Sequence, residues 1–266
     1  MVQKAGVRRM ILTPQNYYSP EANQHYFSVS QIKSFAECPA CTMAELRGEY
    51  VRPVTSALLI GSYVDAYFEG TLDRFKSERP ELFKRDGTLK AEYAHADRMI
   101  ARAEADKVFM KHMQGEKQVI RTGTIDGFPF KIKMDVLHPE RIVDLKTCKD
   151  FLPVYKPGAG RMSFIEAYGY TLQGAVYQAI EGCSKPFYIN AITKETMPDI
   201  AVIRIGQEYL DAEMTVLRQN LPYYDAIKQG IVEPPRCEHC AYCKATRVLT
   251  GPIGLDEFEM IYYEGE

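Results

Sequence analysis

The segment "MDVLHPERIVDLKT" (134–147) constrains the fold of this chain more than any other. Two short apolar runs flank a turn signal around Pro139, which predicts two neighbouring strands. Asp135 lies in the first strand, and Asp144 and Lys146 lie in the second. Since residues i and i+2 of a strand face the same side of a sheet, Asp144 and Lys146 are expected to point into one site. The connection is short enough to let Asp135 approach Asp144.

This pair of carboxylates with an amine suggests metal chemistry. Two carboxylates at one sheet edge repel each other unless a cation lies between them. Oxygen ligands suit Mg²⁺ or Mn²⁺, and such an ion can activate water and stabilise charge on a phosphoryl oxygen. Lys146 could then orient or deprotonate the attacking water, or neutralise charge in the transition state. The alternative is an ordinary surface Asp–Lys pattern, and the motif alone does not decide between them.

The rest of the chain predicts helices around these strands. Apolar spacing and end signals predict helices at 28–36, 56–70, 89–113, 161–182 and 207–230, the last with Pro222 as a candidate break. Strands are predicted at 117–122, 124–137, 141–147, 186–193 and 199–205. A loop with Gly158 and Gly160 is expected between the third strand and the helix at 161–182. Asp126-Gly127 is a hairpin-turn signal inside the second strand segment. The order predicts a mixed α/β core wrapped by helices.

Length and charge bound the function without naming it. The chain has 266 residues, enough for one large domain, and a formal net charge of −2. A polyanionic partner would therefore need a locally basic groove. Neither a membrane-length apolar run nor a signal peptide stands out, so we expect a cytoplasmic protein without membrane contact.

Basic residues follow the Asp144 strand closely. Lys149, Lys156 and Arg161 lie in a loop whose glycines permit close backbone approach to a phosphate. This loop is a candidate DNA-guiding element, and a solvated surface loop is the alternative. Lys131 and Lys133 alternate with apolar residues on the preceding hairpin, where they could face DNA or water.

Seven cysteines are present, an odd number that argues against a disulfide framework in a chain without a secretion signal. Three of them, Cys237, Cys240 and Cys243, are separated by two-residue spacers near the end of the sequence. Clustered cysteines of this kind favour a metal site, with reduced, unligated thiols as the alternative.

Four motifs in order resemble those of PD-(D/E)XK nucleases. "MDVLHPERIVDLKT" resembles the core motif. "LLIGSYVDAYFEG" is similar to the first motif of RecB-type and RecE-type members through Gly61 and Glu69, although Asp65 occupies the place usually held by His. Gln173 and Tyr177 match the family's Gln-x-x-x-Tyr motif, and "FSVSQIKSFAECPACTMAEL" resembles the N-terminal segment that carries an early Cys-Pro. The match looks closest to phage-type RecE-like exonucleases.

The resemblance implies a restriction-endonuclease-like core, namely a mixed central sheet flanked by helices, with an N-terminal helical annex and a C-terminal Cys-rich tail. It implies a metal site for Mg²⁺ or Mn²⁺ formed by Glu69, Asp135, Asp144, the Leu145 carbonyl and Asp65. Lys146 would assist the water, and Gln173 and Tyr177 would orient the strand being cut. Cys38 would join the three late cysteines around a 4Fe-4S cluster or, alternatively, zinc, with Cys41 and His239 as possible substitutes in a zinc site.

The function implied is that of a Mg-dependent exodeoxyribonuclease that processes linear DNA ends in phage-type recombination. Its partners would be DNA and a single-strand annealing protein, and homo-oligomerisation is open. The expected organisation is one nuclease domain (1–266) with a helical part (28–115), a catalytic α/β core (116–230) and a Cys-rich tail (231–266). Two alternatives remain: a non-catalytic DNA-binding or scaffold protein of the same fold, or a zinc-binding adaptor that acts through the Cys tail.

Overall fold

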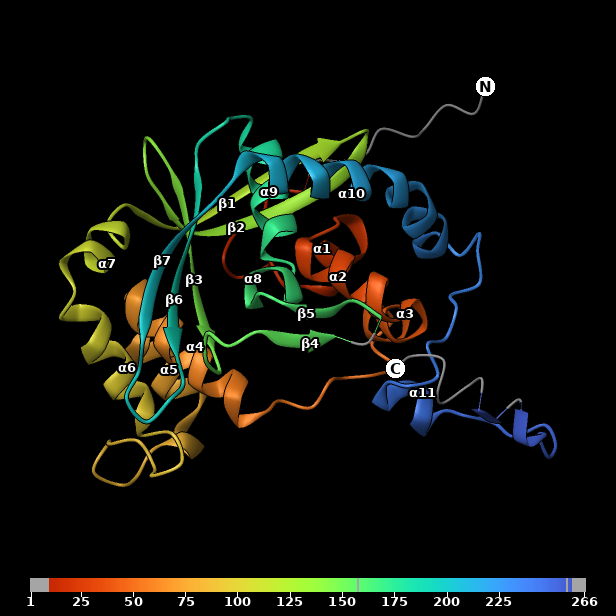
Figure 1. Ribbon diagram of the computed structural model, residues 1–266, viewed down its shortest axis with the longest axis horizontal. Helices are drawn as coiled ribbons and strands as arrows, with labels where there is room; N and C mark the ends of the chain where they lie inside the picture. The colour runs from red at the N-terminus through yellow and green to blue at the C-terminus, as the bar shows by residue number, and fades with distance from the viewer. Residues whose placement is uncertain (1–9, 157, 257, 260–266) are drawn as a thin grey trace.

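A five-stranded mixed sheet forms the centre of the computed structural model, which describes residues 10–156, 158–256 and 258–259 (Figure 1). The strand order is β1-β2-β3-β6-β7. Only β3 and β6 run parallel, and the other neighbours are antiparallel. The strands are β1 (Glu116–Ile125), β2 (Phe128–Leu137), β3 (Ile142–Cys148), β6 (Phe187–Thr193) and β7 (Ile200–Ile205). The predicted mixed α/β fold is therefore confirmed.

Helices surround this sheet, and a small separate hairpin lies beside it. The helices are α1 (Pro20–His25), α2 (Val29–Glu37), α3 (Pro39–Leu46), α4 (Ser56–Glu69), α5 (Leu72–Glu78), α6 (His95–Glu104), α7 (Lys107–His112), α8 (Phe164–Ala167), α9 (Tyr170–Glu181), α10 (Gln207–Lys228) and α11 (Ala241–Ala245), with a 3₁₀ turn at Pro80–Leu82. The hairpin pairs β4 (Val154–Lys156) with β5 (Gly160–Met162). The segment expected to be a loop is therefore partly strand.

Local end signals explain the helices that bring residues to the sheet. The Ser28 side chain caps α2 by accepting a hydrogen bond from the Gln31 N–H, and Pro39 opens α3. Helix α4 ends at Gly70, whose φ of 77° is the left-handed conformation that glycine adopts at little cost. The start of α2 and the end of α4 agree with the boundaries predicted from the sequence.

Three expectations about helix continuity need correction. The segment 89–113 forms two helices, because the Asp106 carboxylate accepts hydrogen bonds from the Val108 and Phe109 N–H groups and starts α7 anew. The segment 161–182 breaks at Gly169, which has a φ of 59° and separates α8 from α9. Pro222 does not break α10, which continues through it to Lys228.

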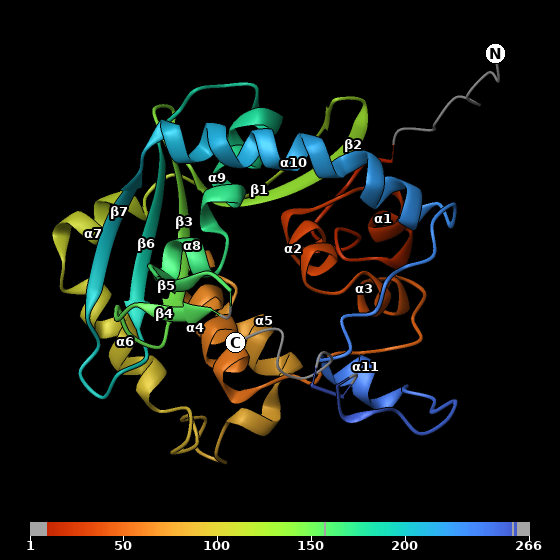
Figure 2. The ribbon, with the colours of Figure 1, turned by 45° about the vertical axis from the view of Figure 1, so that its right-hand side comes forward.

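Two apolar cores lie on opposite faces of the sheet. Helices α2, α9 and α10 contribute to one core and α4, α6 and α7 to the other. In Figure 2, α10 runs across α9 and the long β1–β2 hairpin. Along β3, Ile142 and Cys148 belong to the first core, and Val143 and Leu145 to the second. Asp144 and Lys146 alternate with the latter pair, so they face the side covered by α9.

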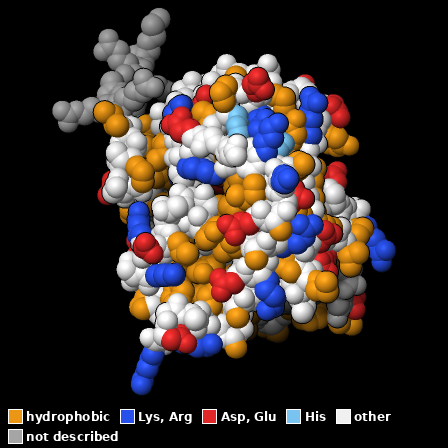
Figure 3. All heavy atoms as spheres, turned by 90° about the vertical axis from the view of Figure 1, so that its left-hand side faces the viewer, with side chains coloured by type: hydrophobic (Ala, Val, Ile, Leu, Met, Phe, Trp, Pro, Cys, Tyr) orange, Lys and Arg blue, Asp and Glu red, His pale blue; other side chains and the backbone are white. Residues whose placement is uncertain are grey.

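The outer surface over α6, α7 and β7 carries basic and acidic side chains interspersed (Figure 3). This arrangement agrees with the small net charge and gives that face little long-range attraction for a polyanion. Among the described residues, none of the helices combines the length and apolar character needed to cross a bilayer.

Candidate active site

A cleft of about 690 Å³ opens where the two predicted strands meet α4 and α9. Its lining combines acidic, basic and amide side chains from segments far apart in the sequence. The lining includes Lys33, Asp65, Glu69, Gln118, Lys133, Asp135, Asp144, Lys146, Gln173 and Tyr177. The six side chains predicted to be catalytic, together with Asp65, therefore lie in one cleft.

Asp144 lies at the floor of the cleft and is 1% exposed. Its Oδ1 accepts a hydrogen bond from Gln173 Nε2 at 2.6 Å, and its Oδ2 forms an ion pair with the Lys146 ammonium. Both oxygens are thus held by neighbours on β3 and α9. The expectation that Asp144 and Lys146 share one face of the strand is confirmed by this contact.

Asp135 lies where β2 and β3 diverge. Ladder pairing between these strands is limited to Val136 with Val143 and Leu137 with Ile142. Next to these two pairs, Asp135 Oδ2 accepts a hydrogen bond from the Leu145 N–H at 2.9 Å. This side-chain hydrogen bond replaces the backbone pairing between the two strands at that point. The splayed strands leave room for the cleft between Asp135 and Asp144.

Helix α4 carries Asp65 and Glu69 to the same cleft, one and two turns beyond Gly61. A Cβ at Gly61 would lie 2.9 Å from Thr147 Oγ1 on β3, closer than ordinary van der Waals contact. The glycine therefore lets α4 approach the strand. The spacing of four and eight residues then places both carboxylates on the face of the helix that Gly61 presents to β3.

The carboxylates in the cleft disturb one another's ionisation. Burial, followed by the charge of Asp135, raises the pKa of Asp144 to about 7, although Lys146 opposes the shift. Burial and Asp135 also raise the pKa of Asp65 well above its ordinary value. Burial raises the pKa of Glu69, with Lys133 acting against it. A cluster of this kind favours binding a cation, because positive charge relieves the repulsion.

Lys146 is the positive charge in direct contact with Asp144. Burial acts to lower the pKa of Lys146, but the charges of Asp144 and Asp135 outweigh it and raise the pKa. The ammonium is therefore held protonated in this arrangement. A divalent ion at Asp144 would compete with Lys146 for the Asp144 carboxylate.

Gln173 and Tyr177 form one hydrogen-bonded unit on α9. Gln173 Nε2 also lies 2.9 Å from the Tyr177 hydroxyl, which donates to the Lys133 carbonyl at 2.8 Å. Both side chains are buried. Tyr177 thus fixes the amide of Gln173, and Gln173 in turn orients Asp144.

The sequence did not predict three residues in or beside the cleft, namely Gln118, Lys33 and Tyr170. Gln118 donates to Asp135 Oδ1 at 3.3 Å and has a φ of 54°, an uncommon conformation for a residue with a side chain. The Lys33 and Lys146 ammonium groups both lie against the Tyr170 ring, 5.0 and 5.3 Å from its centroid. Neither Gln118 nor Lys33 stands out in the sequence, because an isolated polar residue in a strand or on a helix has no motif.

The basic side chains of the predicted loop do not line this cleft. Lys156 and Arg161 are on the β4–β5 hairpin, and Lys149 is 92% exposed with an ion pair to Asp150. The three are not among the described residues that line the cleft. Their contact with DNA stays a prediction.

Lys131 is buried, contrary to the expectation that it could face water. Its ammonium donates to the Tyr17 carbonyl and, at 2.7 Å, to Asn23 Oδ1. Lys131 and Lys133 both line the cleft, but Lys131 is only 1% exposed.

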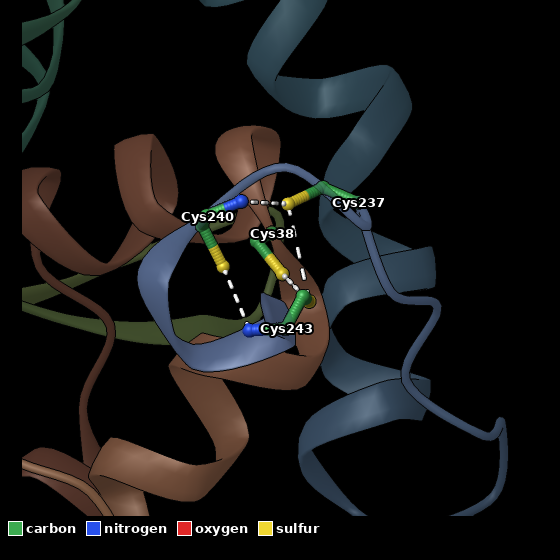
Figure 4. Close-up of side chains that lie close together, drawn as sticks. All are labelled: Cys38, Cys237, Cys240 and Cys243. Carbon is green, nitrogen blue, oxygen red and sulfur yellow. Dashed lines mark hydrogen bonds between the residues drawn. The ribbon is translucent and has the colours of Figure 1, made fainter. Parts of the chain in front are cut away.

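The four predicted cysteines meet at one point outside the cleft. The Sγ atoms of Cys38, Cys237, Cys240 and Cys243 all lie within 4.8 Å of one another, and the side chains converge in Figure 4. Cys38 precedes α3, and the other three belong to the tail around α11. Segments from the early and late parts of the chain therefore meet here.

The donor atoms fit two kinds of metal. The carboxylates of the cleft offer the hard oxygen ligands that suit Mg²⁺ or Mn²⁺. The thiols offer the soft ligands that suit zinc or iron. The first set is placed for chemistry in an open cleft, whereas the second lies among buried and half-buried groups.

Comparisons with known proteins agree with this architecture. A solved structure from Eubacterium rectale, named "Putative exonuclease", is 44% identical, with a TM-score of 0.89 over 94% of this chain and 98% of its own. Another, SSO0001, is 12% identical over 85% of this chain and 96% of its own, and its TM-score of 0.27 supports no argument. No curated protein matches. A family model described as "PDDEXK-like domain of unknown function (DUF3799)" matches residues 28–246, and the chain belongs to this PDDEXK-like family.

Proposed function

We propose that this protein is a metal-dependent deoxyribonuclease that hydrolyses phosphodiester bonds at the ends of linear DNA. The observation that carries the proposal is the convergence of Asp65, Glu69, Asp135, Asp144 and Lys146 in one cleft. Carboxylates whose pKa values are raised in a cleft are typical of functional sites, and a metal-dependent hydrolase uses such a cluster. The name of the 44% identical relative also supports the exonuclease assignment.

The residues of the cleft have distinct roles in this proposal. Glu69, Asp135 and Asp144, with the Leu145 carbonyl and Asp65, would hold Mg²⁺ or Mn²⁺. When bound, the ion supplies an activated water and stabilises charge on the phosphoryl oxygens. Gln173 keeps Asp144 aimed through its hydrogen bond. Lys146 orients the attacking water or compensates the negative charge that develops on the phosphate.

The cellular role we propose is end processing in phage-type recombination, alongside a single-strand annealing protein. The motif order supports it, as a resemblance to RecE-like exonucleases. An open cleft bordered by Lys33, Lys133 and Arg74 is suited to a DNA strand with its phosphates. The predicted homo-oligomer and the DNA contacts of Lys149, Lys156 and Arg161 belong to the same proposal.

The deciding experiment is product analysis on linear duplex DNA labelled at either the 5′ or the 3′ end, with Mg²⁺ or Mn²⁺. We expect mononucleotide or short products from one labelled end and none from a covalently closed circle. Lys146→Ala should lose activity by about 10²-fold or more, the scale of a positioned acid, base or charge. Lys107→Ala, an exposed lysine of α7, is the matched control. Linear DNA left intact by the wild-type protein with either ion would refute the proposal.

A further inference from the structure

The four-cysteine cluster has a geometry that distinguishes between the two metals expected from the sequence. Cys38 Sγ lies 3.5 Å from Cys243 Sγ, which lies 4.0 Å from Cys237 Sγ. These distances exceed the bond length of a disulfide, about 2.05 Å, and all four cysteines are free. The sulfurs are therefore close without being bonded, as ligands of a common ion are.

The spacing fits one tetrahedral ion. With Zn–S bonds of about 2.3 Å, the sulfurs of a tetrahedron lie about 3.8 Å apart. The sulfur–sulfur distances of 3.5 and 4.0 Å bracket this value, and all four sulfurs lie within 4.8 Å of one another. A four-iron cluster places an iron–sulfur cube between the thiolates and holds them farther apart. The donor set fits a single ion and does not fit the 4Fe-4S cluster that the family resemblance implies.

Backbone N–H groups around the cluster are already placed to support thiolates. The Cys41 N–H donates to Cys38 Sγ at 3.4 Å, the Cys240 N–H to Cys237 Sγ at 3.3 Å, and the Cys243 N–H to Cys240 Sγ at 3.4 Å. Three of the four sulfurs thus accept a backbone hydrogen bond. Such bonds stabilise negative charge on sulfur, and contacts of this kind around the ligands tune metal sites.

Positive side chains lie beside the cluster as well. Four thiolates around a divalent ion leave two negative charges. Arg236 donates to the Cys243 carbonyl at 2.6 Å and forms an ion pair with Glu238, which also pairs with Arg247. The aromatic rings of Tyr50 and Tyr242 meet 5.3 Å apart at the same place. The cluster is thus enclosed by a network from both chain segments.

We propose that Cys38, Cys237, Cys240 and Cys243 bind one structural Zn²⁺ ion that fastens α2 and α3 to the C-terminal tail. Cys38 and Cys243 are 205 residues apart in the sequence, so the ion closes most of the chain into a loop. The fastened helix α2 carries Lys33 into the cleft. Cys41 and His239, considered as substitutes, are not members of the converging group among the described residues.

The test is metal analysis of the full chain, purified anaerobically from cells supplied with both iron and zinc. We expect about one zinc per chain, no acid-labile sulfide and no visible iron–sulfur absorbance. Replacement of zinc by Co²⁺ should give the visible d–d bands of tetrahedral thiolate coordination. Cys240→Ser should reduce the zinc content and the melting temperature, whereas Cys183→Ser, outside the cluster, should change neither.

Two results would overturn the proposal. One is stoichiometric iron with acid-labile sulfide in the anaerobic preparation. The other is a wild-type chain that holds no metal and melts at the same temperature with and without added zinc. Both readouts are independent of nuclease activity, so the failure of the zinc site and the failure of the proposed function can be told apart. Wild-type metal content decides the question even if Cys240→Ser does not fold.

Discussion

The close approach of α4 to β3 at Gly61 predicts a substitution that separates stability from activity. In Gly61→Ala, the new Cβ would lie 2.9 Å from Thr147 Oγ1, where ordinary contact begins at 3.4 Å. The helix must therefore move away by about half an ångström, or Thr147 must rotate. Overpacking of this kind costs about 1–3 kcal/mol, but Ala gains about 1 kcal/mol over Gly in a helix interior. The net loss of stability should be roughly 0–2 kcal/mol.

The activity should respond more strongly than the stability. Asp65 and Glu69 extend from the same helix, so its displacement moves both carboxylates relative to Asp135. Misplacement by about 1 Å can cost about 10²-fold in rate, and a half-ångström shift should cost about 10-fold or more. The assay is the initial rate of nucleotide release from linear duplex DNA with Mn²⁺, together with chemical denaturation to measure the free energy of unfolding.

A second substitution provides the control. Thr147→Ala removes the hydroxyl that the new methyl group meets, so the double variant Gly61→Ala/Thr147→Ala should regain most of the lost activity. Thr147→Ala alone should stay near wild type. Wild-type activity in Gly61→Ala would refute the argument that close approach positions the carboxylates, and so would a double variant that is as inactive as the single one.

Three further predictions concern other parts of the cleft. Lys33→Met keeps the aliphatic stem and removes the charge, so DNA binding should weaken. The slope of the logarithm of the DNA-binding constant against the logarithm of the salt concentration, measured by fluorescence anisotropy, should fall by about one in magnitude. An unchanged slope would exclude a phosphate contact. Gln118→Gly should match or exceed wild type in thermal stability, since glycine accepts its positive φ, but should lose activity because Asp135 loses a donor; equal activity would show that this donor is dispensable. The raised pKa of Asp144, about 7, means that without metal the folded state binds more protons than the unfolded state between about pH 4 and 7. The contribution of Asp144 to the stability of the folded state should therefore fall as pH rises through this window. The gain in melting temperature from Mn²⁺ should be larger at pH 8 than at pH 6. An equal gain at both pH values would contradict the assignment of Asp144 as a metal ligand.

The sequence predicted the parts of the site that depend on periodicity. The alternation of residues along the strand was enough to place Asp144 and Lys146 on one face, and helical spacing was enough to align Gln173 with Tyr177. It could not predict the contacts of Lys33 or Gln118, because these depend on how separate elements pack. The break at Asp106 was missed for a related reason: one capping side chain overrode a continuous apolar pattern.

The burial of Lys131 shows a different limit of pattern reading. Alternation along β2 predicted an exposed position, yet the N-terminal segment covers that strand and supplies carbonyl and amide oxygens to the ammonium. Burial lowers the pKa of Lys131 to about 8. The residues that bury Lys131 lie more than 100 positions earlier in the chain, so its burial follows from tertiary packing and not from the local pattern.

The same N-terminal segment bears on where the folding unit can be cut. The family model begins at residue 28, but Phe27 is 1% exposed and its ring lies 5.6 Å from that of Phe130 and 6.3 Å from that of Phe35. Loss of a buried Phe costs about 3–5 kcal/mol, a large share of the roughly 5–15 kcal/mol that keep a domain folded. A fragment trimmed to the limits of the family match would expose the Phe130 face and aggregate, whereas one that begins before α1 would keep its core closed.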